Sequence, residues 1–128
     1  MSQRFIQNPW LSDVFTTTNA TITSSTTAIY APPSGSTGYV EITILARNTS
    51  TGAVGVSKIA QSFKNIAGTV SLAGSLISIV GVAGALVGDL TTAIAGLIVV
   101  STATITPQVT GIVATNIEWL IDARYWVN

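Results

Sequence analysis

The sequence predicts an all-β protein: a single β-sandwich, jelly-roll-like, with an extended N-terminal arm. Apolar residues alternate with small or polar residues over several segments, which is the period of a strand. The β-branched residues Val, Ile and Thr are abundant, as strands prefer. Turn-forming residues recur at intervals of roughly ten, a spacing typical of sandwiches. We therefore expect an arm over residues 1–15 and a sandwich domain over residues 16–128.

The clearest strand is expected at 39–47, because its apolar residues occupy alternate positions. One side of this strand should face the core through Val40, Ile42, Ile44 and Ala46. The NTSTG segment at 48–52 reads as a hairpin loop, and 53–64 reads as the returning strand.

The rest of the chain divides in the same way into strands and turns. Further strands are expected at 16–31 (two short ones), 69–80, 90–105 and 115–127. Loops or turns are expected at 31–38, 65–68 and 107–111. The glycine-rich residues 81–89 are expected to form a loop, a bulged strand or a tightly packed passage through the interior. In the last strand the face that contains Ile117 should be buried, because it carries the larger share of apolar residues.

The low charge of the chain predicts association with other protein surfaces. Only 8% of the 128 residues are charged and the formal net charge is zero, whereas soluble domains carry about a quarter of charged residues. Low net charge favours association, and flat strands rich in Thr and Val leave edges that pair with other chains. We expect a homo-oligomer, with a trimer favoured over a dimer.

Composition also excludes most catalytic chemistry. The chain has no Cys and no His, which excludes Ser-His-Asp and Cys-His nucleophiles and most zinc sites. Glu118 and Asp122 would lie about 13 Å apart along one strand, too far for a glycosidase pair. Glu41 can meet either of them across a sheet, although pairing with Arg47 or Arg124 is favoured. We expect no enzyme activity, no cofactor, no metal site and, without a basic stripe, no nucleic-acid binding.

A membrane-inserted helical hairpin is a distant alternative. Residues 65–88 are uncharged, lie between Lys64 and Asp89, and are numerous enough to span a bilayer. The strand-like alternation, the many Ser and Thr residues and the missing aromatic belts argue against insertion. The start of the chain has no apolar run after a basic segment, so no secretory signal peptide is expected.

The first fifteen residues have a high density of large side chains. Pro9 interrupts any helix there, and the segment is too short to fold alone. It is either a strand that packs on its own domain or an arm that docks on a neighbour. The second reading predicts a partner interface made of Phe5, Ile6, Trp10, Leu11, Val14 and Phe15.

Several short motifs between about residues 39 and 125 occur together in a recognisable order. These are ILAR at 44–47, the NTSTG turn, Phe63-Lys64, AGTVSLAGS at 67–75, VTG at 109–111 and I-x-W at 117–119. In this combination the chain resembles a β-sandwich domain found in structural proteins of tailed bacteriophages, in tail and fibre parts and in head-decorating proteins. The resemblance supplies no catalytic residues.

The resemblance implies a non-enzymatic virion structural protein. The leading interpretation is a capsid decoration (cement) protein on the capsid exterior, which binds the major capsid protein, or other virion proteins, through its arm and sandwich. Many copies, each with a modest interface, would stabilise the shell. The alternative is a tail-fibre or tail-tip module that recognises the host surface, in which Tyr39 and the 31–38 loop would matter more than the arm.

Overall fold

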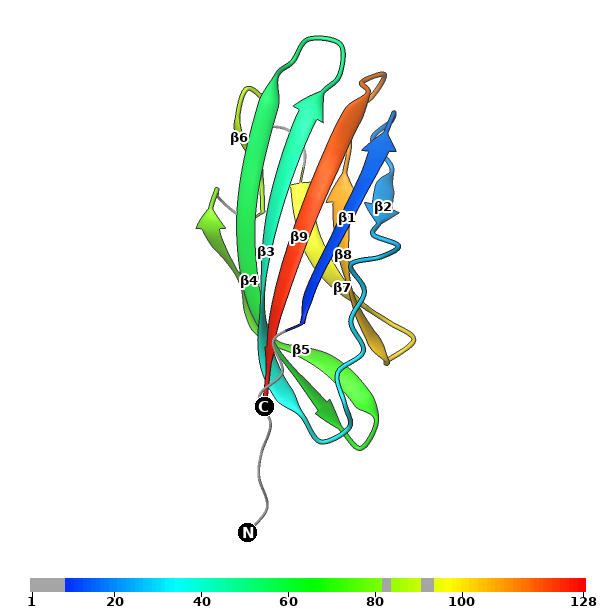
Figure 1. Ribbon diagram of the computed structural model, residues 1–128, viewed down its shortest axis with the longest axis vertical. Helices are drawn as coiled ribbons and strands as arrows, with labels where there is room; N and C mark the ends of the chain where they lie inside the picture. Colours follow the sequence, from blue (N-terminus) through cyan, green and yellow to red (C-terminus); the bar gives the residue numbers. More distant parts are fainter. Residues whose placement is uncertain (1–8, 82–83, 91–93) are drawn as a thin grey trace.

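The computed structural model describes residues 9–81, 84–90 and 94–128, which form two antiparallel β-sheets packed face to face (Figure 1). The large sheet contains, in spatial order, β1 (Trp10–Thr17), β9 (Ile117–Val127), β3 (Thr37–Asn48), β4 (Val54–Ile66) and β5 (Thr69–Val80), with β6 (Val87–Gly88) paired to β4. The small sheet contains β2 (Ile22–Ser24), β8 (Thr104–Thr110) and β7 (Ile94–Val100). This arrangement confirms the predicted β-sandwich, although its strand order does not confirm the jelly-roll part.

No helix in the described part of the chain is long and apolar enough to cross a membrane. Residues 69–80, which lie in the run that the membrane alternative placed in a helical hairpin, form β5 instead. The helical reading is therefore wrong for these residues, and the alternation of apolar with small side chains was the correct guide.

The central strands β3 and β9 bury every second side chain, as the sequence predicts. Val40, Ile42, Ile44 and Ala46 are fully buried, and so is the Ile117 face of β9. The two strands pair in antiparallel register from Gly38 opposite Val127 to Asn48 opposite Ile117. The inner face of each strand is apolar, and the charged residues of both strands lie on the outer face. Any slip by one residue would bury these charges and expose the core, so the register is fixed.

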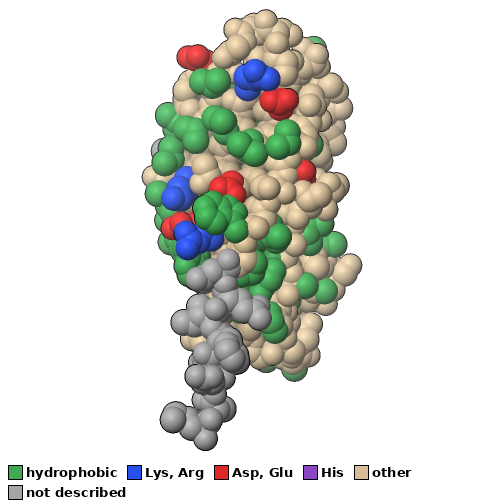
Figure 2. Space-filling view, viewed as in Figure 1, with side chains coloured by type: hydrophobic (Ala, Val, Ile, Leu, Met, Phe, Trp, Pro, Cys, Tyr) green, Lys and Arg blue, Asp and Glu red, His purple; other side chains and the backbone are tan. Residues whose placement is uncertain are grey.

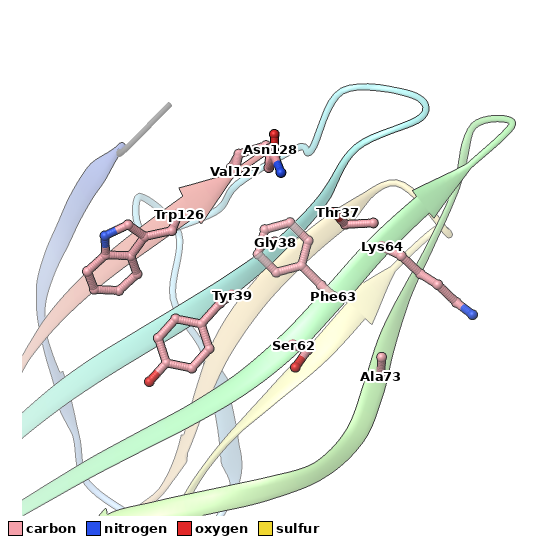
Figure 3. A pocket seen from close by; sticks show the side chains of 10 residues that line it. All are labelled: Thr37, Gly38, Tyr39, Ser62, Phe63, Lys64, Ala73, Trp126, Val127 and Asn128. Atoms are coloured by element: carbon pink, nitrogen blue, oxygen red, sulfur yellow. The ribbon is translucent and has the colours of Figure 1, made fainter. Parts of the chain in front are cut away.

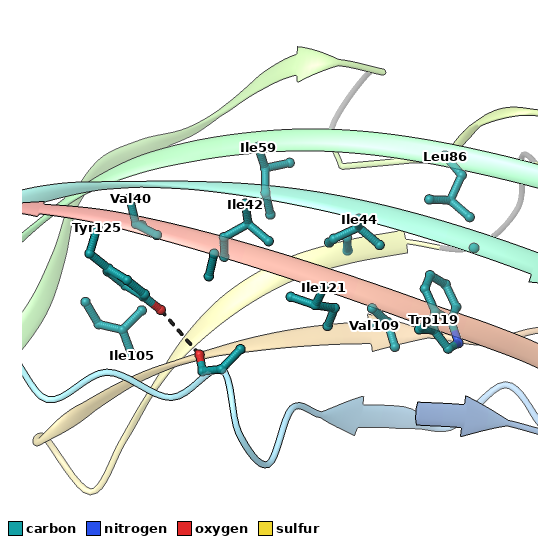
Figure 4. Packing of buried hydrophobic residues seen from close by; sticks show 14 of the residues in the cluster. Val40, Ile42, Ile44, Ile59, Leu86, Ile105, Val109, Trp119, Ile121 and Tyr125 are labelled. Carbon is teal, nitrogen blue, oxygen red and sulfur yellow. Dashed lines mark hydrogen bonds between the residues drawn. The ribbon is translucent and has the colours of Figure 1, made fainter. Parts of the chain in front are cut away.

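The core between the sheets contains the buried rings of Phe63, Trp119 and Tyr125, the last two of which are labelled in Figure 4. Trp119 donates an indole hydrogen bond to the Thr17 hydroxyl at 2.8 Å, which satisfies its buried N–H. Tyr125 donates to the Ala28 carbonyl at 3.4 Å, and its ring lies 6.1 Å from that of Phe63. The small sheet covers these rings with aliphatic side chains that include Ile105 and Val109.

The turns on both sides of β4 lie where the sequence predicts them. At 48–52, the Asn48 side chain accepts hydrogen bonds from the backbone of Ser50 and Thr51. Between β4 and β5, Ala67 and Gly68 take positive φ angles of 53° and 89°, the conformation of a two-residue hairpin that matches strand twist. Strand β5 has the predicted bounds, 69–80.

Two predictions near the small sheet are wrong. The strand expected at 90–105 is divided by a turn between β7 and β8, where Ser101 and Thr102 take positive φ without glycine. The turn expected at 107–111 lies largely within β8, which includes Pro107. The Pro107 carbonyl accepts a hydrogen bond from Ser25 just beyond β2. Proline has no backbone N–H, and at Pro107 the nitrogen points to the same side of β8 as the carbonyl, toward β2. The pairing of β8 with β7 therefore loses no backbone hydrogen bond.

Strand β1 runs through the boundary that the sequence analysis placed between residues 15 and 16. It pairs with β9 from Trp10 opposite Arg124 to Thr17 opposite Ile117, so residues 10–15 form an edge strand of the large sheet. Of the two interpretations of the first fifteen residues, these positions follow the one in which the segment packs on its own domain. Phe5 and Ile6 lie outside the described residues.

Candidate functional site

Charged side chains gather on the outer face of the large sheet, away from the small sheet (Figure 2). Alternation along each strand sends these residues outward, opposite to the buried ones. On β3, β4 and β9 the charged residues that face outward are Glu41, Arg47, Lys58, Lys64, Glu118, Asp122 and Arg124. This face, unlike the core, therefore offers groups that can contact a ligand.

An aromatic cluster on this face consists of Trp10, Tyr39 and Trp126 around the guanidinium of Arg124. The guanidinium carbon lies 5.3 Å from the ring centroid of Trp10 and 4.8 Å from that of Trp126, which are cation–π distances. Trp126 also stacks on Tyr39 at 5.4 Å with an angle of 39° between the rings. The register explains the grouping, because Trp10 pairs with Arg124 and Tyr39 with Trp126.

Carboxylates hold the cluster in place. The Trp10 indole donates a hydrogen bond to Asp122, and the Tyr39 hydroxyl donates to Glu41 Oε1 at 2.8 Å. The other Glu41 oxygen lies 3.7 Å from Lys58 Nζ. Burial, the hydrogen bond to Glu41 and its negative charge together raise the pKa of Tyr39 to about 12. The phenol is therefore neutral near pH 7 and keeps its proton for the bond to Glu41.

A shallow groove of about 540 Å³ lies beside the aromatic cluster, at the end of the sheet (Figure 3). Tyr39 and Trp126 line one part of it, and Ser62 and Lys64 of β4 line another. Gly38 is required at its base, because a Cβ there would collide with the ring of Phe63 and the carbonyl of Trp126. The lining is completed by Thr37, Phe63, Ala73, Val127 and Asn128.

A smaller hollow of about 160 Å³ lies on the other side of Arg124. It is lined by Trp10, Glu41, Thr43, Lys58, Asp122 and Arg124. The two carboxylates there already hold Tyr39, Lys58 and Trp10 in position. Among the residues that the structure describes, no three Asp or Glu side chains gather into a set that could hold a metal ion.

The structure divides the predicted partner interface into two parts. Trp10 and Val14 lie on the outer face and are 63% and 61% exposed. Leu11 and Phe15 point inward and pack against the core, so their apolar surface is already used by their own domain. The 31–38 segment, which the tail alternative favoured, reaches the groove through Thr37 and Gly38.

The sequence analysis did not single out Arg124 and Trp126 as a binding unit. Each residue was visible as an outward position of the last strand, but their neighbours come from β1 and β3, more than 80 residues earlier in the chain. Of the predicted charge pairs, Arg47 and Glu118 form an ion pair at 3.1 Å. Glu41 lies opposite Arg124 in the register and forms its ion pair with Lys58.

No known family of protein sequences matches the chain, and no curated protein matches it in sequence. Solved structures to which the chain is similar include two phage tailspike proteins. The tailspike protein of Acinetobacter baumannii bacteriophage Fri1, a capsular polysaccharide depolymerase, is 11% identical with a TM-score of 0.43, over 91% of this chain and 17% of that protein. The tailspike protein of Acinetobacter baumannii phage AM24 is 13% identical with a TM-score of 0.45, over 95% of this chain. The chain spans 17% and 26% of the lengths of these two proteins.

Proposed function

We propose that this chain is a non-enzymatic structural module of a tailed-phage virion, located in the tail, which binds a host-surface glycan through the groove and the aromatic cluster. The sequence resemblance described above supplies the virion setting. The observation that carries the binding role is the placement of Arg124 between Trp10 and Trp126 on an outward face. Two indole rings fixed by side-chain contacts on a surface are not needed for the core, which lies on the opposite face of the same strands.

The chemistry of the groove supports a glycan ligand. A sugar ring presents C–H groups on its faces and hydroxyl groups around its rim, so it combines apolar and polar contact. Trp126 and Tyr39 offer flat aromatic surface, and Ser62, Lys64 and Asn128 offer hydrogen-bonding groups around it. Apolar walls with a few placed polar groups are the usual composition of a ligand site.

Capsid decoration is the second candidate, and one observation favours it. Trp10 and Val14, two of the predicted interface residues, are exposed on the edge strand β1. Leu11 and Phe15 argue against it, because they pack into the sandwich. Of the four predicted interface residues that the structure describes, these two are therefore not available to contact a capsid. The proposed tail module would contact its ligand through Trp10 and does not require Leu11 or Phe15 to be exposed.

The test is binding of the full-length chain to an array of bacterial surface polysaccharides, with tryptophan fluorescence as a second readout. We expect Trp126→Ala and Trp10→Ala to bind at least about tenfold more weakly, because each removes a stacking surface. Ile22→Ala is the matched control, since Ile22 is 62% exposed but belongs to the small sheet. Its binding should equal that of the wild type.

Two outcomes would contradict this proposal. One is the absence of binding to any polysaccharide on the array. The other is binding that Trp126→Ala leaves unchanged, since the groove would then not be the site. Co-sedimentation with phage shells that lack this protein, weakened by Trp10→Ala or Val14→Ala, would favour the capsid candidate instead.

A further inference from the structure

A second feature of the outer face is an apolar band, made of Val14, Leu45, Val54, Val56, Val87 and Leu120. Val14 is 61% exposed, and Leu45, Val54, Val87 and Leu120 are 43–48% exposed. The register places Val14 opposite Leu120, Leu120 opposite Leu45, Leu45 opposite Val56 and Val56 opposite Val87. The band is therefore a continuous row across five strands, with Val54 beside it in the next row opposite Arg47. It is visible in Figure 2 next to a charged pair. Contiguous apolar surface of this kind marks an interaction site.

Two outward rows near the band pair an acid with a base on the two central strands. The row between the band and the second of these holds Asp122 opposite the uncharged Thr43. Arg47 on β3 pairs with Glu118 on β9, and their side chains lie 3.1 Å apart. Two rows further along, beyond the band, Glu41 on β3 pairs with Arg124 on β9. In each row one strand carries the acid and the other the base. The band itself has Leu45 on β3 and Leu120 on β9.

This pattern is self-complementary under a twofold rotation. When a second copy is turned by 180° about an axis that runs between β3 and β9 along the strands, its β9 lies over the first copy's β3. Arg47 then faces the second copy's Glu118, Leu45 faces its Leu120, and the same contacts recur in the other direction, as an isologous interface requires. An axis at right angles to the strands would instead bring Glu118 toward the second copy's Asp122, two like charges.

We infer that the apolar band is the interface of a twofold dimer in which the large sheets of two copies pack face to face. Five strands spaced about 4.8 Å apart and three rows spaced about 7 Å apart cover roughly 500 Å² of sheet in each copy. The total of about 1,000 Å² lies at the lower limit for a specific interface, so we expect a weak dimer that dissociates on dilution. This proposed dimer differs from the trimer favoured on the sequence alone, and the experiment below distinguishes the two.

The groove lies outside the three rows counted in the interface, although the same axis directs Tyr39 toward the second copy's Trp126. It is open only as far as the twist of the two sheets separates them at that end. It begins at Tyr39, four residues and about 14 Å along β3 from Thr43, and its lining extends to Asn128 beyond the end of β9. The inference stands independently of the proposed function, because it depends on the band and the ion pair rather than on the aromatic cluster.

Sedimentation velocity of the full-length chain over a range of micromolar concentrations tests the dimer. The wild type should shift from monomer to dimer. Arg47→Glu and Glu118→Arg alone should each dimerise at least about tenfold more weakly, because two like-charge contacts replace two ion pairs. A mixture of the two variants should regain wild-type dimerisation. In the mixed dimer both contacts between copies are again acid to base, whereas the pair within each copy remains mismatched.

Lys64→Glu is the charge-reversal control, since Lys64 lies on the same face outside the band, and it should dimerise like the wild type. Val14→Asp is a second interface variant at an exposed edge position, expected to remain monomeric while its thermal unfolding stays cooperative. The inference is overturned by a wild type that is monomeric throughout, by a ring with an odd number of subunits, or by the absence of recovery on mixing.

Discussion

The two faces of the large sheet come from the same strands and have opposite properties. Along β9, Ile117, Trp119 and Ile121 point inward and are completely buried. The intervening residues Glu118 and Leu120 point outward, where one forms an ion pair and the other is 43% exposed. The inner face of β3 and β9 is uniformly apolar, whereas the outer face combines aromatic, aliphatic and charged rows.

This contrast separates the residues that fold the chain from those available for contact. Burial of the inner face removes large aliphatic and aromatic groups from water, which is the main source of folding stability. Outward residues contribute little to that term, so their identity is free to serve binding. In a chain with only 8% charged residues, the concentration of charges and indole rings on one face is the strongest functional signal.

The largest expected difference between the faces comes from truncating adjacent residues on β9. Ile121→Ala should lower the free energy of unfolding by about 2–5 kcal/mol, because it leaves a cavity in a packed core. Leu120→Ala, its neighbour on the outer face, should cost less than about 1 kcal/mol. Chemical denaturation measured at a concentration where the chain is monomeric gives both values. Equal losses would mean that the outer face is also packed against something in the free monomer.

An intermediate effect is expected at Asp13, which points from β1 toward the loop after β2. Its carboxylate accepts hydrogen bonds from the Ser25 hydroxyl at 2.7 Å and the Thr26 backbone at 2.9 Å. Burial opposes ionisation, but these bonds and those from Thr27 outweigh it, so the pKa of Asp13 is lowered from 3.8. Asp13→Asn should cost about 1 kcal/mol near neutral pH.

The pH dependence of that cost has a definite sign. Because the folded pKa of Asp13 lies below the unfolded value of 3.8, the stabilisation is present above pH 3.8 and is lost as pH falls through the folded pKa. The difference in the free energy of unfolding between wild type and Asp13→Asn should therefore shrink on acidification. A difference that stays constant or grows at low pH would show that the hydrogen bonds to the ionised carboxylate are not its cause.

The smallest effect is expected at the ion pair between Arg47 and Glu118. The two side chains are 56% and 44% exposed, so solvent screens their attraction. Arg47→Ala should change the free energy of unfolding of the monomer by no more than about 0.5 kcal/mol. Denaturation at low and high salt provides the measurement. A loss above 1 kcal/mol would place the pair among the folding contacts and weaken its assignment to the interface between copies.

The sequence predicted the strands best where the period of two was uninterrupted. Residues 39–47 and 115–127 alternate cleanly, and both the strands and their buried faces were right. Prediction failed around β7 and β8, where the turn uses Ser101 and Thr102 at positive φ rather than Gly, and where Pro107 lies inside a strand. In both places tertiary pairing overrides the local signals from which turns are predicted.

The candidate site was only partly predictable, because a site on a sheet depends on register. Trp10 and Tyr39 were identified as contact residues from the sequence, each for a different reason. Their meeting with Arg124 and Trp126 requires two strand pairings that join the beginning, middle and end of the chain. A shift of either pairing by one residue would separate the rings, and nothing local specifies that alignment.

The position of β9 between β1 and β3 also determines when the molecule can form during its synthesis. Strand β1 is translated early but pairs in the large sheet with β9, made of residues 117–127. Strand β3 can pair with β4 as soon as that strand is made, but its other edge also waits for β9. Until that strand leaves the ribosome, the nascent chain carries exposed apolar segments without their central partner. Such long-range pairing folds slowly and is prone to aggregation while incomplete. We therefore expect protection by chaperones during translation to matter more for the yield of this protein than the stability of its finished fold.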